Sequence, residues 1–348
     1  MSRVAVVTSS PPFSEGGHLV IARSLVHALR ESGHEADLMV TPSHRFGRQA
    51  SSYIATWFTD VTFAEDGGPV DRVISLRYPS YAVRHPAHVS WLNHRMREYY
   101  DLWDGFSASL RRGQRMKERV RRYAIRATDR YLLTRNVRKV FAQSNAIKAR
   151  LARFGGIPSE VLHPPAPQRR YRCDGYGDFI FAVSRLTPLK RLDLLVEALA
   201  LPECRGVKCV IGGDGSERGR LEDLIARRGL GSRVELAGPL DCTALVAHLA
   251  ACRAVCFPTR AEDYGLVTIE AFESAKAVIT CADSGGPAEL VVDGQNGYVV
   301  PPTPEALASA IRRVMDDQPL AERMGEAAKA RAAAMTWPAV VERLLLAV

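Results

Sequence analysis

Two glutamates in the second half of the chain have the surroundings of a ligand-binding loop. Glu262 and Glu270 are separated by seven residues in PTRAEDYGLVTIEAFESAKAVIT, which follows an apolar run, AVCFP, typical of a strand. Gly265 allows a sharp turn between them, and a helix expected from Leu266 presents unpaired N–H groups at its start. These amides and the positive end of the helix dipole favour an anion. A sugar diphosphate fits this description, with both carboxylates accepting hydrogen bonds from hydroxyl groups.

Two cations extend this pattern. Arg185 and Lys190 follow the apolar run FIFAVS, and ligands of open α/β sheets bind at the carboxyl ends of strands. Charge-assisted hydrogen bonds are worth roughly 1.5–3 kcal/mol each, so the two cations could hold a pyrophosphate and stabilise a departing nucleotide. Taken singly, the residues have plainer interpretations: Glu262 as a surface residue, Glu270 as the partner of a nearby cation, and both cations as ordinary helix-start residues.

Four longer segments show a family resemblance. SRLTPLKRLDLLVEAL, IGGDGSERGRLEDLI, EDYGLVTIEAFESAKAVI and SGGPAELVVDGQNGYVV resemble, in the right order, successive motifs of family-four glycosyltransferases. The resemblance is close over about residues 179–300 and fainter in the first half. It implies an α/β protein of the GT-B fold, in which two Rossmann-like, doubly wound domains face each other across a cleft.

The resemblance also implies an activity. This is transfer of a hexosyl or N-acetylhexosaminyl group from a UDP- or GDP-sugar to a hydroxyl of a small-molecule, natural-product or saccharide acceptor, with retention of anomeric configuration. Carried over by position, Arg185 and Lys190 hold the donor diphosphate. Glu262 meets hydroxyls of the transferred sugar, and Glu270 holds the nucleotide ribose. The implied catalytic residues are His94, Arg185, Lys190 and Glu262. The implied donor-binding residues are Gly16, Gly17, Arg185, Lys190, Glu262, Asp263, Tyr264, Gly265, Leu266 and Glu270.

Further glycine-rich elements match the family. Gly285 and Gly286 are expected to form a loop that closes near the donor, whereas IGGDG, with Gly213 and Asp214, is expected to shape the sheet edge. In the first half, Gly16 and Gly17 precede a helix and let the backbone approach a phosphate or sugar.

His94 opens a second pattern in the first half. WLNHRMREYYDLW resembles an element of some of these enzymes in which a His is followed by Arg and then Tyr-Asp-Leu. The matching residues are His94, Arg97, Tyr100, Asp101 and Leu102. His94 is expected at a strand end, facing the cleft and orienting the acceptor; a purely structural histidine is the alternative.

The sequence also departs from related patterns. No Asp-x-Asp triplet occurs, so a metal-held diphosphate is not expected, and the enzyme should need no cofactor beyond its nucleotide-sugar co-substrate. Arg191 stands where the family commonly has glycine, and Glu273 and Lys276 stand where it has small residues. These departures leave the base and the sugar of the donor open.

The composition suits two α/β domains in a reducing compartment. With 348 residues and 47% hydrophobic residues, the chain exceeds one ordinary core. The seven cysteines are odd in number and form no CxxC pair, which indicates reduced thiols, a cytoplasmic location and no metal. The N-terminal apolar run is too short for a signal peptide, and no window approaches the roughly 18 apolar residues of a membrane span.

Alternating strand and helix patterns divide the chain. We expect an acceptor-binding domain over 1–170, a donor-binding domain over 171–335, and a helix over 336–348 that packs back on the first domain. The boundary lies in HPPAPQRRYRCDGYGD, whose Pro, Gly and charge are typical of an exposed crossing. Strands are expected at RVAVVT, EADLMV, DRVISL, HVSWL, KVFAQS and SEVLH, and then at FIFAVS, VKCVIGG, RVELAG, AVCFPT and AVITC. The second domain should therefore hold five strands.

A basic helix is expected within residues 111–139, which contain twelve Lys/Arg and two acids. Beside its arginines runs an apolar stripe: Met116, Val120, Tyr123, Ala127 and Tyr131. The stripe is expected to pack on the domain while the arginines face solvent, an anionic acceptor or lipid headgroups. Residues 1–170 carry 27 Lys+Arg against 14 Asp+Glu, which favours an anionic partner.

Four other functions are weighed on the sequence. One is a peripheral membrane glycosyltransferase at the inner membrane face, which acts on a lipid-linked acceptor in cell-surface polysaccharide synthesis. Another is a nucleic-acid-binding protein, but no RRM, KH or zinc-finger pattern accompanies the basic helix, so no nucleic acid is expected as a partner. A nucleotide-sugar epimerase or a phosphorylase would need cleft acids and histidines, or a cofactor lysine, that the sequence does not place.

Overall fold

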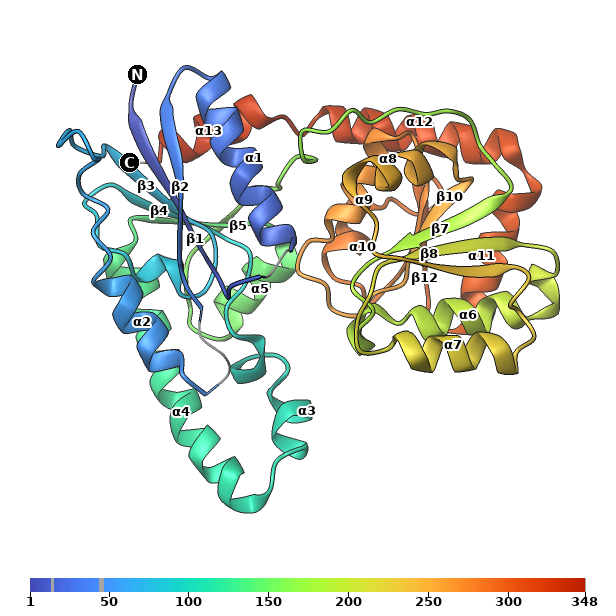
Figure 1. The fold of residues 1–348 in the computed structure, drawn as a ribbon, viewed down its shortest axis with the longest axis horizontal. Coiled ribbons are helices and arrows are strands. Elements are labelled where there is room, and N and C mark those ends of the chain that lie inside the picture. The colour runs from blue at the N-terminus through green and yellow to red at the C-terminus, as the bar shows by residue number, and fades with distance from the viewer. Residues whose placement is uncertain (14–15, 44–46, 348) are drawn as a thin grey trace. The chain divides into compact units, whose positions relative to one another are not determined.

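The chain folds into two compact units (Figure 1). The computed structural model describes residues 1–13, 16–43 and 47–347. One unit comprises Met1–Pro164 and Trp337–Val348, and the other comprises Pro165–Thr336. The predicted boundary near 170 differs from this division because Ala166 is buried in the core of the second unit.

The first unit is built on a parallel six-stranded sheet. Its strands are β1 (Arg3–Ser10), β2 (Glu35–Pro42), β3 (Arg72–Ser75), β4 (His88–Leu92), β5 (Lys139–Ala142) and β6 (Glu160–Val161). They lie in the order β2-β1-β3-β4-β5-β6, and every neighbouring pair is parallel. Each strand coincides with a run predicted from the sequence. The order reverses direction beside β1, so ligands are expected near the carboxyl ends of β1 and β3.

The helices of the first unit cover this sheet and extend from it. They are α1 (Gly17–Glu31), α2 (Gln49–Trp57), α3 (Trp103–Ala108), α4 (Arg112–Tyr131), α5 (Asn145–Arg153) and α13 (Trp337–Leu345), with short turns η1 (Ser80–Ala82), η2 (Arg97–Tyr99) and η3 (Leu132–Asn136). The last helix, α13, packs on this unit, where the Trp337 ring lies edge-on to that of Trp91 at 6.1 Å. Helices α3 and α4 form an arm that projects from the sheet (Figure 1).

The second unit holds another parallel six-stranded sheet. Its strands are β7 (Phe179–Val183), β8 (Lys208–Gly212), β9 (Val234–Gly238), β10 (Ala254–Phe257), β11 (Val278–Cys281) and β12 (Gly297–Val300). Their order is β12-β11-β10-β7-β8-β9, the doubly wound Rossmann arrangement. The prediction of five strands was wrong, because β12 pairs with β11 as a sixth. Since β12 is four residues long, starts with a glycine and follows the turn residues DGQN, its local sequence has little strand character.

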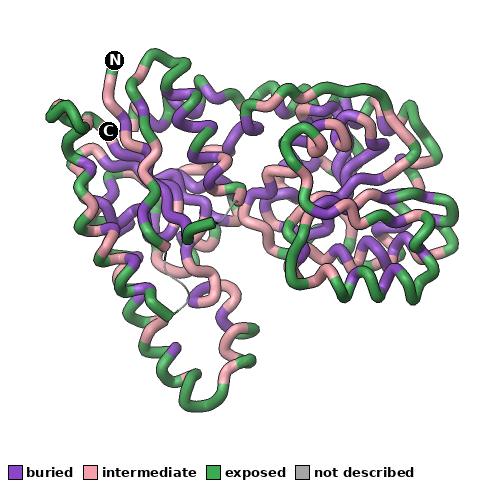
Figure 2. The backbone as a smooth tube through the Cα atoms, viewed as in Figure 1, coloured by how far each residue is buried: buried purple, intermediate pink, exposed green. Residues whose placement is uncertain are grey.

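Helices lie on both faces of the second sheet (Figures 1 and 2). They are α6 (Leu192–Ala200), α7 (Arg218–Arg227), α8 (Cys242–Ala251), α9 (Leu266–Glu273), α10 (Gly286–Leu290), α11 (Pro304–Asp316) and α12 (Gln318–Ala333), with short turns η4 (Pro188–Lys190) and η5 (Pro202–Cys204). Successive strand residues alternate between two buried clusters: Ile180 belongs to one and Phe181 to the other. The core of this unit therefore lies on both faces of the sheet.

Candidate functional site

The sheet order of the second unit brings the predicted donor residues to one place. Strands β7 and β10 are neighbours, although two strands separate them in sequence, so the chain reverses its winding direction between them. Arg185 follows the carboxyl end of β7, and Glu262 lies in the loop that follows β10. Open α/β sheets bind ligands at such a switch point. The predicted cations and carboxylates therefore share the expected edge of the sheet.

Lys190 and Glu262 form an ion pair at this edge. The Lys190 Nζ contacts Glu262 Oε2, and the two side chains are only 13% and 23% exposed. The Arg260 N–H donates to the Leu189 carbonyl at 2.7 Å, which joins the two loops that carry the pair. Arg185 differs from Lys190, because it is exposed and its guanidinium makes no hydrogen bond or ion pair with any described residue. Of the two cations predicted to bind a diphosphate, Lys190 is thus paired with a carboxylate of the protein, whereas Arg185 is available to a ligand.

Arg191 explains why the family commonly has glycine after the lysine. Its φ is 47°, in the left-handed region that disfavours residues with a side chain. The guanidinium contacts Asp283 and donates to the Pro258 and Thr259 carbonyls at 2.9 and 2.6 Å. The departure from glycine thereby ties η4 to the loop after β10. Arg191 is also the N-cap of α6, which begins at Leu192.

The Gly285–Gly286 loop lies against the Glu262 loop. The Glu262 N–H donates to the Ser284 carbonyl at 2.7 Å, and the Gly286 N–H donates to the Glu262 carbonyl at 3.1 Å. A Cβ atom on Gly286 would lie 2.5 Å from the Tyr264 Cα, so only glycine allows this approach. The carbonyl of Asp214 accepts from the Leu186 N–H at 2.9 Å, so the IGGDG segment supports the residues that follow β7.

Gly265 sets the start of α9. Its φ is 82°, and a Cβ atom there would lie 2.7 Å from Pro287 Cγ. The Gly265 carbonyl accepts from Thr268 at 2.9 Å, while the N–H groups of Leu266 and Val267 donate to no described residue. Free amides at the start of a helix favour an anion. Asp263 and Tyr264, which precede this turn, are half-buried and buried respectively.

Glu270 is buried in α9 beneath a segment that the sequence interpretation treated as an exposed crossing. Only 4% of the residue is exposed. Arg169 forms an ion pair with its carboxylate, and the Tyr171 hydroxyl donates to it at 3.1 Å. Burial raises the pKa of Glu270, and the Arg169 guanidinium opposes that rise. Neither Arg169 nor Tyr171 was singled out from the sequence, because the surrounding Pro, Gly and charge hid their pairing.

In the first unit, Gly16 is the N-cap of α1 and Gly17 is the first residue of that helix. The Gly16 carbonyl accepts from Leu19 at 2.9 Å, and its backbone is extended, a conformation open to any residue. Neither conformation nor crowding by the backbone therefore demands glycine at position 16, where a Cβ atom would meet only the flexible His18 ring at 3.1 Å. The helix predicted to follow the two glycines begins at Gly17 itself.

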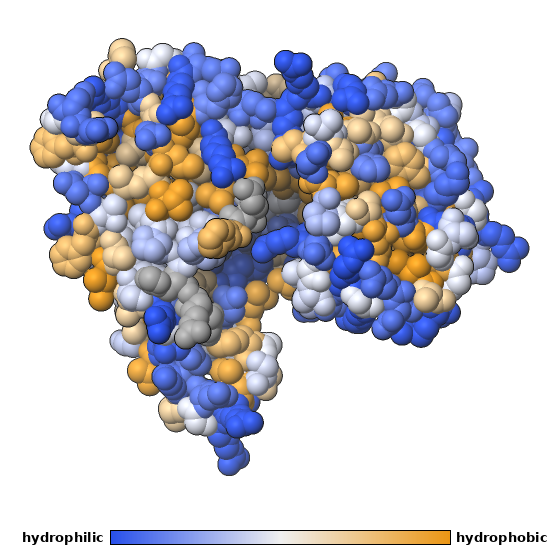
Figure 3. All heavy atoms as spheres, viewed as in Figure 1, coloured by the Kyte–Doolittle hydropathy of each residue, from blue (hydrophilic) through white to orange (hydrophobic). Residues whose placement is uncertain are grey.

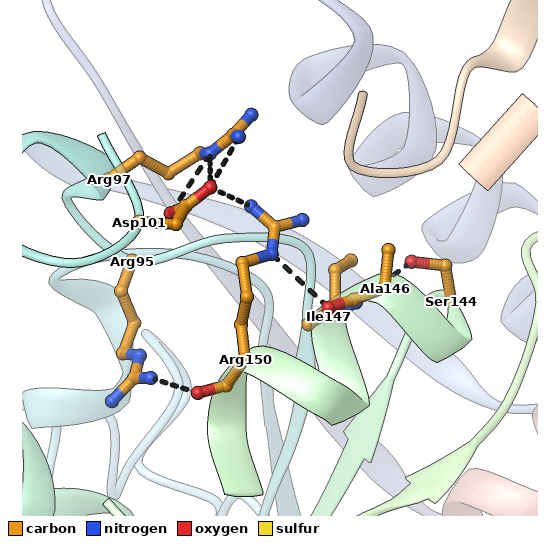
Figure 4. A network of polar contacts seen from close by, with 7 residues as sticks. All are labelled: Arg95, Arg97, Asp101, Ser144, Ala146, Ile147 and Arg150. Atoms are coloured by element: carbon orange, nitrogen blue, oxygen red, sulfur yellow. Dashed lines mark hydrogen bonds and ion pairs between the residues drawn. The ribbon is translucent and has the colours of Figure 1, made fainter. Parts of the chain in front are cut away.

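His94 follows the end of β4, as predicted, and lines a small cavity together with Arg97, Asp101 and Arg150. Figure 4 shows the network of charged side chains that these three residues form. Arg97 donates to Asp101 at 2.5 and 3.0 Å, and Arg150 approaches the same carboxylate at 3.5 Å. A cavity of about 20 Å³ lies between these groups and His94, which is too small for a sugar. Tyr100, also part of the predicted pattern, instead donates to the buried Asp129 at 2.6 Å.

The fold and the site define a class of protein. Two Rossmann-like units of parallel sheet, with an anion-favouring loop at the switch point of the second, make up the GT-B class of glycosyltransferase folds. Solved structures of this class cover nearly the whole chain. Sucrose-phosphate synthase from Thermosynechococcus elongatus has a TM-score of 0.78 and 19% identity and covers 99% of this chain and 98% of its own. HepE from Anabaena, in complex with UDP and glucose, has a TM-score of 0.71 and 17% identity and covers 98% of each chain.

Sequence comparison points to a family. Residues 170–331, nearly the whole of the second unit, match the family Glycosyl transferases group 1. An alpha-D-kanosaminyltransferase from Streptomyces kanamyceticus is 36% identical over 163 residues, which are 46% of this chain and 42% of the relative. The chain spans less than half the length of the curated relatives it matches.

Proposed function

We propose that the protein transfers a hexosyl or N-acetylhexosaminyl group from a UDP- or GDP-sugar to a hydroxyl of a small-molecule, natural-product or saccharide acceptor. The observation that carries this proposal is the Lys190–Glu262 ion pair beside the free amides of α9, at the switch point of a unit that matches Glycosyl transferases group 1. The name of the kanosaminyltransferase relative and the UDP and glucose held by HepE support a nucleotide-linked hexose as donor.

Each predicted site residue of the second unit has a proposed role. The diphosphate replaces Glu262 as the partner of Lys190 and takes Arg185 as a second cation, which offsets charge on the departing nucleotide. Glu262, released from Lys190, accepts hydrogen bonds from the sugar hydroxyls. The amides from Asp263 to Leu266 contact the sugar and phosphate, and Glu270 accepts from the ribose. No metal or other cofactor is required, since side-chain cations do this work.

The first unit is proposed to bind the acceptor. Gly16 and Gly17 allow close approach of a phosphate or sugar, and His94 orients the acceptor hydroxyl. Transfer proceeds with retention, through attack on the same face as the leaving phosphate, which takes the acceptor proton. The sugar–phosphate bond breaks as the new glycosidic bond forms, so the products are a glycoside and a nucleoside diphosphate.

The test is a donor and acceptor panel. We expect release of UDP or GDP that depends on an acceptor, is insensitive to EDTA, and gives a product whose anomeric configuration matches that of the donor by NMR. Inverted product would overturn retention, and EDTA sensitivity would overturn metal independence. Absence of nucleoside diphosphate release with every donor and acceptor would overturn the proposed activity.

A second candidate adds a membrane, because α4 presents its apolar stripe outward. Met116, Val120, Tyr123 and Tyr131 are 62, 67, 79 and 58% exposed. The expectation that this stripe packs on the domain was therefore wrong: the helix is anchored through Ile125, Asp129 and Glu118 instead. Hydrophilic and hydrophobic side chains lie side by side over the α3–α4 arm (Figure 3).

The charges of α4 suit an anionic surface. Both of its acids are buried, Glu118 paired with Arg121 and Asp129 holding three tyrosine hydroxyls. Beside α4 lies a trough of about 1120 Å³ whose lining includes Arg119, Arg122, Arg126, Arg130, Arg135 and Arg153. No described helix is both long and apolar enough to cross a bilayer, so contact with a membrane would be at its surface. On this candidate, a cytoplasmic enzyme lies at the inner membrane face and glycosylates a lipid-linked acceptor.

Flotation with vesicles separates this candidate from the first. Anionic phosphatidylglycerol vesicles should carry the protein at low salt, and phosphatidylcholine vesicles should not. Val120→Ser with Tyr123→Ser should reduce flotation, whereas Ile54→Ser, which alters a 59% exposed apolar residue of α2, should leave it unchanged. Failure to bind anionic vesicles would end the membrane candidate and leave the transferase proposal standing.

A further inference from the structure

The segment that enters the second unit lies over the carboxylate of Glu270. It runs from Pro165 to Asp178 and contains no helix or strand, yet Ala166 is buried against the core and Arg169 and Tyr171 are only partly exposed. Arg169 and Tyr171 contact Glu270 of α9, from which they are separated by 101 and 99 positions in the sequence. Its side chains therefore belong to the structure around α9.

The two oxygens of Glu270 are used differently. Arg169 Nη1 and the Tyr171 hydroxyl both donate to Oε1. Glu270 Oε2 accepts no hydrogen bond from any described residue. A carboxylate held through one oxygen keeps its orientation and leaves the lone pairs of the other available to a ligand hydroxyl.

We infer that Arg169, assisted by Tyr171, is a positioning residue for nucleotide binding, which fixes Glu270 through Oε1 so that Oε2 accepts the ribose hydroxyls. The inference rests on the proposed function, since it takes Glu270 as the ribose ligand. Arg169 acts through Glu270 rather than by touching the reacting atoms. A ribonucleoside diphosphate is the ligand class that this arrangement would recognise.

Electrostatics gives the positioning role a measurable consequence. Burial raises the pKa of Glu270, and Arg169 is the main opposing charge, followed by the Tyr171 hydrogen bond. Two titratable groups act on the Glu270 carboxyl directly, namely Arg169 and Tyr171. Cys242 acts on Arg169. Without the guanidinium, the folded-state pKa of Glu270 rises further, and the protonated acid becomes a weaker acceptor for a hydroxyl.

The experiment measures affinity for UDP and GDP between pH 6 and pH 8. As the pH falls from 8 to 6, the affinity of Arg169→Met should drop by a factor at least about ten times larger than that of wild type. The reason is that the buried carboxyl of Glu270 takes up a proton in the variant. Arg169→Lys should restore most of the wild-type profile, and Tyr171→Phe should give a smaller change in the same direction. In Arg169→Met with Glu270→Gln, the added pH dependence should vanish.

Arg170 supplies the matched control. It is exposed, adjacent in sequence and unpaired among the described residues, so Arg170→Met should keep the wild-type profile. An affinity loss in Arg169→Met that is equal at every pH would reduce Arg169 to a structural residue and overturn the inference, as would an unchanged affinity. If wild type binds neither nucleotide, the proposed donor site itself fails, which is a different result.

Discussion

At the scale of single residues, the charged side chains of the proposed donor site pair with one another. Lys190 meets Glu262, and Arg169 meets Glu270, so a buried or half-buried charge is not left unpaired. Arg185 is the exception, because its guanidinium is exposed and has no partner among the described residues. On the proposed function, a diphosphate displaces Glu262 from Lys190, whereas it binds Arg185 without breaking an existing ion pair.

Arg185→Ala should therefore lower turnover without lowering stability. We expect a loss of at least ~100-fold in kcat, as for removal of a donor that stabilises developing negative charge. The unfolding midpoint should not move, because the side chain makes no contact that supports the fold. Arg205→Ala, at another exposed position of the second unit, is the control. Unchanged turnover in Arg185→Ala would remove this residue from the mechanism.

Two substitutions at Arg191 distinguish the cost of its backbone conformation from the contribution of its side-chain contacts. Both Arg191→Ala and Arg191→Gly lose the contacts with Asp283 and with two carbonyls, so both should be less stable than wild type. Only glycine relieves the positive φ, so the glycine variant should be more stable than the alanine variant by about 1 kcal/mol. Urea unfolding followed by far-UV circular dichroism measures the difference. Equal stability of the two variants would show that the backbone conformation carries no cost.

At the scale of elements, the first sheet contains a histidine that cannot easily charge. His88 in β4 is fully buried, with its Nε2 2.8 Å from the Ser75 Oγ of β3. Burial lowers its pKa to about 3, below the ordinary value of 6.5. Below pH 6.5 the unfolded chain binds a proton that the folded chain does not. The stability of this unit should therefore be complete above pH 6.5 and decline as the pH falls towards 3.

His88→Asn should flatten this decline. The histidine contributes up to about 1.4 kcal/mol per pH unit to the slope, which the neutral amide removes. The four tryptophans, Trp57, Trp91, Trp103 and Trp337, all lie in the first unit, so their fluorescence reports its unfolding alone. Urea unfolding at pH 7, 6 and 5 gives the slope for each protein. An identical slope in wild type and His88→Asn would show that another group controls acid sensitivity.

The elements also show where sequence reasoning ends. Buried strands were predictable because runs such as FIFAV and AVCF are apolar and bounded by turns. The inward face of α4 was not predictable, because its apolar stripe is exposed and the tyrosine hydroxyls on Asp129 decide which face turns inward. The pairing of Arg169 with Glu270 spans 101 residues and leaves no local pattern.

At the scale of the molecule, the chain is two Rossmann-like units joined by sequence, each with its own sheet and switch point. The family match covers the second unit, which carries Arg185, Lys190, Glu262 and Glu270. Gly16 and Gly17, proposed to approach a phosphate or sugar of the donor, lie in the first unit with His94, which is proposed to orient the acceptor. Most of the proposed donor contacts thus lie in one unit and the proposed acceptor contact in the other.

The most direct test of this account is a thermal-shift panel of UDP, GDP, ADP, TDP and their common sugar conjugates. A ligand that binds only the folded state raises the apparent stability, by about 2.7 kcal/mol at a hundred times its Kd. We predict a shift for UDP or GDP and its conjugates in wild type and in Glu273→Ala, and loss of that shift in Glu270→Ala. A protein that responds to no nucleotide, or that responds equally with and without Glu270, would contradict the assignment of the second unit as a nucleotide-sugar site.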